Sequence, residues 1–164
     1  MGSYIGSVFG QFGGNNNSIV NTILTGSVSG QTMLGGFVGF SNQNVTIQNS
    51  TSSQNISGKL NQIGGIIGTQ MNNVTVIDSL ITQTNLSGNS QIGGFVGQLT
   101  STLFITNSKI QSVRISGIIQ LGIIVGWSNG GTFTIIGTTS SSNFIKGNAQ
   151  TNCTLSNTWS ASQC

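Results

Sequence analysis

Short stretches of alternating apolar and polar residues recur along this chain, and each is bounded by Gly, Asn or Ser. In residues 44–50, 73–79 and 102–108 the apolar side chains occupy alternate positions, which is the pattern of a β-strand with one buried face. Val45 and Ile47 are expected to point to one side and Thr46 to the other. No stretch of comparable length has helical spacing, so the pattern predicts an all-β fold.

A glycine phrase returns every 29 residues, and this period defines the expected architecture. It reads Gly-Gly-Phe-Val-Gly or Gly-Gly-Ile-Ile-Gly, with looser versions at both ends, and it occupies residues 6–10, 35–39, 64–68, 93–97 and 122–126. A fixed period of this length indicates a solenoid built from one stacked unit. We predict a parallel β-helix (β-solenoid) of about five coils with three short strands per coil. An antiparallel sandwich of hairpins is the competing fold, but it requires no such repeat.

The period also sets the expected boundaries. The β-solenoid repeat domain is predicted over residues 1–150, followed by a capping tail at 151–164. Its coils are expected at 6–34, 35–63, 64–92, 93–121 and 122–150. Asn55 and Asn85 are 30 residues apart, so one loop must absorb a single-residue insertion. Phe133 and Ile135 face inward only if another residue is added before them.

Stacked coils place like residues on like, which predicts three columns. The first is a buried core ladder of Phe37, Ile66, Phe95 and Ile124. The second follows the third strand of each coil and contains Val28, Ile56, Leu86, Ile115 and Phe144. The third is a polar column at a turn, formed by Asn49, Asp78 and Asn107, in which Asp78 is expected to accept backbone hydrogen bonds. The paired glycines are expected to turn the chain at positive φ.

The glycine phrase, an Asn/Ser-rich strand and a hydrophobe-Ser-Gly step, as in Asn55-Ile-Ser-Gly58 and Asn85-Leu-Ser-Gly88, together resemble the GLUG repeat. That repeat occurs in bacterial surface proteins and adhesins, and similar arrays are typical of large surface or secreted proteins of single-celled eukaryotes. The resemblance covers residues 6 to about 150. It implies a non-catalytic stalk or display module and carries over no catalytic residues. Phe or Ile in place of the bacterial Leu, together with the abundant Asn, favours the eukaryotic arrays.

The composition excludes several function classes. The chain has four Lys or Arg, one Asp or Glu and no His, and its net charge is +3. Its cations form no cluster in the sequence, so it lacks the basic patch expected for nucleic-acid binding. The longest apolar run, residues 115–127, is too short to span a bilayer. The first residues resemble no secretory signal.

The sequence also lacks the residues that catalysis and metal binding require. Glycosidic cleavage needs two carboxylates, whereas Asp78 is the one carboxylate side chain. A serine nucleophile needs a nearby base, while calcium repeats need rows of Asp and zinc needs Cys/His sets. We expect no enzyme activity, no cofactor and no metal site. A flat Thr array of the ice-binding kind begins with Thr46 and Thr75 but breaks at Phe104.

Seven Asn-x-Ser/Thr sequons are the candidate modification sites, and two pairs of them recur at equivalent positions of neighbouring coils. They are Asn16, Asn44, Asn49, Asn55, Asn73, Asn85 and Asn152. N-linked glycans there would hydrate a surface with little charge. In the tail, Cys153 and Cys164 are expected to form a disulfide that closes a loop, worth about 3 kcal/mol in the chain-entropy model. The alternative is two free thiols. A disulfide indicates an oxidising compartment.

These features together predict an extracellular or cell-surface structural protein. The first and last coils of a solenoid expose unpaired backbone groups, and natural solenoids cap them. A C-terminal cap is available in 151–164, but only residues 1–5 precede the first coil. We expect head-to-tail pairing with another copy, or with further repeats of a longer chain. The alternative is a cell-surface adhesin or carbohydrate-binding module that uses aromatics such as Tyr4, Phe104, Trp127 and Trp159.

Overall fold

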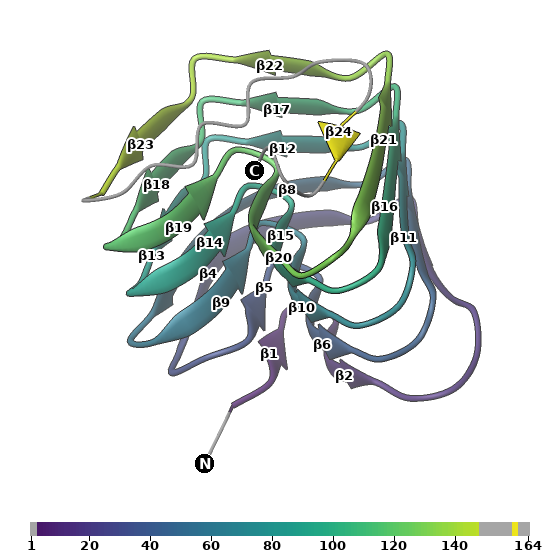
Figure 1. Cartoon of the computed structure of the whole chain (residues 1–164), viewed down its shortest axis with the longest axis horizontal. Coiled ribbons are helices and arrows are strands. Elements are labelled where there is room, and N and C mark those ends of the chain that lie inside the picture. The colour runs from purple at the N-terminus through teal and green to yellow at the C-terminus, as the bar shows by residue number, and fades with distance from the viewer. Residues whose placement is uncertain (1–2, 148–158, 161–164) are drawn as a thin grey trace.

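The computed structural model describes residues 3–147 and 159–160, and the regular elements within them are all β-strands. The coils stack from the purple N-terminal end to the green C-terminal end (Figure 1). Each coil contributes to four sheets, here named A to D, and equivalent strands of successive coils pair in parallel. The predicted β-solenoid of about five coils is therefore confirmed. The strand number exceeds the expected three per coil, because the glycine phrase bends in its middle and yields two short strands. In the later coils a second bend, as between Thr82 and Asn85, divides the last strand as well.

Sheets A and B flank this bend. Sheet A contains β1 (Ile5–Gly6), β5 (Leu34–Gly35), β9 (Asn61–Gly64), β14 (Ser90–Gly93) and β19 (Ile119–Gly122). Sheet B contains β2 (Phe9–Phe12), β6 (Val38–Ser41), β10 (Ile67–Gln70), β15 (Val96–Leu99) and β20 (Val125–Ser128).

Sheets C and D complete each coil. Sheet C contains β3 (Asn17–Val20), β7 (Val45–Gln48), β11 (Val74–Ile77), β16 (Thr102–Thr106), β21 (Thr132–Ile136) and β24 (Trp159–Ser160). Sheet D contains β4 (Ile23–Gly30), β8 (Thr51–Gly58), β12 (Leu80–Thr82), β13 (Asn85–Ser87), β17 (Lys109–Gln111), β18 (Arg114–Ser116), β22 (Thr139–Ser141) and β23 (Phe144–Lys146). Figure 1 shows sheet D along the top and left and sheet C on the right, while sheets A and B meet in the middle.

The glycine phrase brings sheets A and B into close contact. A Cβ at Gly64 would overlap the carbonyl oxygen of Ile67, and a Cβ at Gly97 would lie 2.5 Å from the backbone nitrogen of Ile63. Neither glycine has a positive φ. The expectation of glycine corners at positive φ is therefore wrong for these two residues, because close backbone approach is what requires glycine there.

Left-handed backbone instead occurs at three columns of non-glycine residues. The corner between sheets C and D uses Asn49, Asp78 and Asn107, with φ of 49°, 49° and 47°. The entry to sheet A uses Met33, Gln62, Gln91 and Gln120, and the bend in sheet D uses Gln83, Ser112 and Ser142. Asn and Asp tolerate this conformation better than other residues that carry a Cβ. The polar turn column at Asn49, Asp78 and Asn107 therefore lies at a true corner of the coil.

The core follows the inward-facing columns. Phe37, Ile66, Phe95 and Ile124 are each at most 3% exposed. The N–H of Phe37 donates to the carbonyl of Ile66 at 3.0 Å, and Ile66 and Phe95 repeat this bond to the next coil. The four residues thus stack one strand spacing apart. In sheet D, Ile115 lies opposite Ile145, whereas Phe144 lies opposite Arg114 and is 58% exposed. The placement of Phe144 in the inward column is therefore wrong by one residue.

Two single-residue insertions account for the departures from the period that the sequence shows between Asn55 and Asn85 and before Phe133. Ser52 pairs with Ile81, but Ile56 pairs with Leu86, so the extra residue of the third coil lies at the bend between β12 and β13. Leu103 pairs with Phe133 and Ile105 with Ile135, and both partners in β21 are buried, as the expected insertion requires. Each insertion falls at a corner, where the sheets on either side keep their register.

The two ends of the solenoid differ. Val8 and Phe9 occupy the columns of Phe37 and Val38, yet they are 37% and 42% exposed because no coil lies beneath them. Ile124 and Val125 in the last coil stay buried. At that end β24 pairs antiparallel with β21, opposite Thr132 and Phe133. In the described part of the chain, the first coil is the more open end.

Candidate functional site

The sequon asparagines in the described residues are all exposed, and two groups of them form vertical arrays. On sheet C, the residues directly before β3, β7 and β11 are Asn16, Asn44 and Asn73. Because side chains alternate along a strand, the hydroxyl residue of each sequon lies on the same face as its asparagine. Ser18, Thr46 and Thr75 are accordingly opposite one another and line, with these asparagines, a hollow of about 320 Å³.

Hydrogen bonds join these asparagines from coil to coil. Asn44 donates its Nδ2–H to Oδ1 of Asn16 at 3.4 Å, and the backbone N–H of Asn73 donates to Oδ1 of Asn44 at 3.3 Å. The hydroxyl of Ser101 continues the series by donating to Oδ1 of Asn73 at 2.8 Å. Asn49, at the corner, donates its Nδ2–H to Oδ1 of Asn21 at 2.6 Å.

The second array lies on the outer face of sheet D. Asn85 donates both its Nδ2–H and its backbone N–H to Oδ1 of Asn55, at 2.7 and 3.2 Å. Beside them, the Ser87 hydroxyl donates to the Ser57 hydroxyl at 3.2 Å. Asn55 and Asn85 thus share one column, as their sequence spacing predicts.

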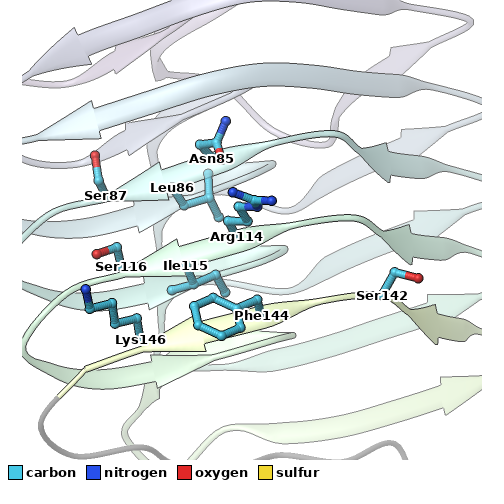
Figure 2. Close-up of a pocket in the computed structure, with 9 residues that line it drawn as sticks. All are labelled: Asn85, Leu86, Ser87, Arg114, Ile115, Ser116, Ser142, Phe144 and Lys146. Atoms are coloured by element: carbon cyan, nitrogen blue, oxygen red, sulfur yellow. The ribbon is translucent and has the colours of Figure 1, made fainter.

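A pocket of about 510 Å³ continues this second array toward the C-terminal end of the solenoid. Figure 2 shows Asn85, Arg114 and Phe144 on successive strands, with Ser87, Ser116 and Lys146 in the neighbouring column. The register places Asn85 opposite Arg114 and Arg114 opposite Phe144. Ser116 lies between Ser87 and Lys146 in the same way.

This pocket corrects the expectation that the cations are scattered. Arg114 and Lys146 are 32 positions apart in the sequence, but they lie on the paired strands β18 and β23, and both line the pocket. Sequence reasoning missed the site because it placed Phe144 in the inward column. Moving that column by one residue turns Phe144 and Lys146 outward beside Arg114. The insertion expected before Phe133 was the available signal, because the same shift continues to β23.

The aromatic residues proposed for ligand stacking do not gather. Phe104 lies half-buried on sheet C between Thr75 and Thr134, so it interrupts the Thr column as expected. Trp127 lies half-buried in sheet B, opposite Gln98. Tyr4 packs against Phe40, with ring centroids 5.0 Å apart.

Asp78 is exposed at its corner, and among the described residues no three His, Cys, Asp or Glu lie close enough to hold a metal ion. Asn152, Cys153 and Cys164 lie outside the described residues. No helix that could cross a membrane occurs in the part of the chain that the structure describes. Comparison with protein-family models and with curated proteins finds no match to this sequence.

Proposed function

We propose that this protein is a non-enzymatic structural protein of the cell surface or extracellular space, a glycosylated subunit that stacks head-to-tail into a filament. The observation that carries the proposal is the open first coil. Its strands β1, β2, β3 and β4 pair with the second coil, and no other strand of the described residues pairs with them. Such edges pair readily with further strands.

Exposed apolar side chains on the first coil also support its role as a docking surface. Val8 and Phe9 hold positions that are buried in every later coil, so a coil docked beneath them would complete two core columns. At the opposite end β24 occupies the free side of β21 in sheet C. The strands β19, β20, β22 and β23 of sheets A, B and D are therefore the surface on which a second copy docks. Further repeats of a longer chain are the alternative occupant of the first coil.

A contact between the first coil of one copy and the last coil of the next does not close on itself. It joins two different surfaces by a translation along the solenoid axis, so it produces a fibre instead of a closed dimer. The resemblance to the GLUG repeat of surface proteins is consistent with such a structural role, as is the poverty of charged side chains.

Negative-stain electron microscopy and sedimentation velocity test the assembly. We expect concentration-dependent fibres from the unmodified chain and their loss in Phe9→Lys, which places a charge on the docking face. Met71→Lys is the matched control, because Met71 is also exposed but lies between β10 and β11 in the middle of the solenoid. A monomer at every concentration, or equal loss of fibres in both variants, contradicts the proposal.

N-linked glycosylation belongs to the same proposal. The exposure of Asn16, Asn44, Asn55, Asn73 and Asn85 supports it, since an acceptor asparagine must be accessible. Intact mass before and after deglycosylation, measured on chain secreted by a eukaryotic host, gives the glycan load. Reduction of the same sample tests the proposed Cys153–Cys164 disulfide.

The pocket on sheet D favours a second candidate function, a cell-surface adhesin or carbohydrate-binding module. It combines amide, hydroxyl, cationic and aromatic side chains on one exposed face. Phe104 and Trp127, on sheets C and B, take no part in it.

A further inference from the structure

The outer face of sheet D carries two parallel columns that change character along the solenoid. The first column runs Ser27, Asn55, Asn85, Arg114 and Phe144, and the second runs Ser29, Ser57, Ser87, Ser116 and Lys146. Alternate residues of one strand lie about 6.6 Å apart, and neighbouring strands lie about 4.8 Å apart. The first three coils therefore present only amides and hydroxyls, and the last two add cations and a ring.

The two cations are free to meet a ligand. The structure gives neither Arg114 nor Lys146 an ion pair among the described residues, and Asp78 lies at the corner between sheets C and D, outside the pocket. Both cations are exposed at the pocket margin. A positively charged pocket with no carboxylate among its described lining residues favours an anionic ligand, and the planar guanidinium of Arg114 matches a carboxylate by two parallel hydrogen bonds.

The uncharged side chains of the pocket indicate which class of anionic ligand it binds. Asn85, Ser87 and Ser116 offer the donors and acceptors that sugar hydroxyls require. The exposed ring of Phe144 offers an electron-rich face to which the polarised C–H groups of a sugar ring can pack. A phosphodiester chain would need more cations than these two.

We propose that this pocket binds an acidic oligosaccharide, with a uronate carboxylate held by Arg114 and Lys146 and the adjoining sugar packed on Phe144. Neighbouring sugars extend along the Asn and Ser columns toward the N-terminal coils. This inference deepens the second candidate function and does not depend on filament assembly. A single chain carries every residue that it requires.

Because Asn85 lines the pocket, oligosaccharide binding depends on whether Asn85 carries an N-linked glycan. This asparagine is a sequon residue and lines the pocket, so a glycan on its Nδ2, the atom that donates to Asn55, would stand over the binding face. The chain with an unmodified Asn85 is the form that binds.

Isothermal titration calorimetry with unglycosylated full-length chain tests the proposal. The probe is a galacturonate trimer, and the comparison is the neutral galactose trimer. We expect saturable binding of the uronate only, weakened by rising salt. Arg114→Gln and Lys146→Gln should each weaken it about tenfold or more, because a charge-assisted hydrogen bond is lost. Phe144→Ser should weaken it as well.

Lys109→Gln is the matched control, because Lys109 is an exposed cation on β17 of the same sheet but does not line the pocket. It should bind like the unmodified chain, and unchanged circular dichroism in every variant excludes unfolding as the cause. Four outcomes would overturn the proposal: no saturable binding, equal binding of the neutral trimer, equal weakening by Lys109→Gln, or equally tight binding of a tetraglutamate peptide. The last would reduce the site to a general carboxylate binder. Docking of a second copy would pair the backbone edge of β23, whereas Phe144 and Lys146 are exposed on its outer face. The filament proposal is therefore tested separately, by electron microscopy.

Discussion

The buried hydroxyl of Ser79 accepts the backbone N–H of Ser50, one coil earlier, at 3.2 Å. Ser79 also donates this hydroxyl to its own chain, to the carbonyl of Ile77 at 2.8 Å. Ser108 repeats the arrangement for the N–H of Ser79. At this corner the backbone turns away from its neighbour, so a column of serine hydroxyls supplies the acceptors that the backbone carbonyls no longer reach.

We predict that Ser79→Ala lowers the free energy of unfolding by about 1–3 kcal/mol, because the buried N–H of Ser50 loses its acceptor. Chemical denaturation measures this change. Ser87→Ala, on the outer face, is the control and should stay within about 0.5 kcal/mol of the unmodified chain. Equal stability of Ser79→Ala would mean that the hydroxyl column does not stabilise the corner.

Replacement of Ser52 should have the opposite effect. Ser52 is fully buried in a column with Ile81, and its hydroxyl has no hydrogen-bond partner among the described residues. Ser52→Ala removes a buried polar group, so we expect unchanged stability or a gain of up to about 1 kcal/mol in the same denaturation experiment. A clear loss would show that the hydroxyl is satisfied in solution.

Gly97→Ala should destabilise the solenoid through the contact between sheets A and B. The added methyl would lie 2.5 Å from the Ile63 nitrogen and 2.6 Å from the Gly68 carbonyl oxygen, and backbone atoms cannot move aside singly. We expect a loss of at least about 2 kcal/mol, seen as a lower thermal midpoint. Gly13→Ala is the control, since nothing lies within 4 Å of its Cβ position. A normal midpoint for Gly97→Ala would contradict the close approach.

Glycans on neighbouring coils should exclude one another. Asn44 and Asn73 lie one strand spacing apart, about 4.8 Å, which leaves no room for two branched glycans side by side. We expect glycopeptide mass spectrometry of secreted chain to find higher occupancy of Asn44 in Asn73→Gln. Asn85→Gln, on sheet D, should leave Asn44 unchanged. Molecules that carry full glycans on both Asn44 and Asn73 would contradict this prediction.

The sheet D pocket shows where sequence reasoning stopped. The repeat predicts that Ile115 faces inward, and alternation then turns Arg114 and Ser116 outward. The one insertion before β21 shifts β21, β22 and β23 alike by one residue. The sequence alone did not carry this shift forward to β23, because Phe144 and Ile145 are both apolar and either could face inward. Pairing of β18 with β23 decides between them and brings Lys146 beside Arg114.

The sequence by itself determined the repeat, the parallel stacking and the inward columns, because a 29-residue period in apolar and glycine positions leaves a chain few ways to bury them. Only the tertiary structure decided the four-sheet coil and the reason for its glycines. Those glycines meet backbone atoms of the facing sheet, as Gly97 in sheet B meets Ile63 in sheet A. The left-handed corners at Gln62 and Gln91 were likewise invisible, because glutamine has no local preference for positive φ and adopts it only where stacked neighbours impose it.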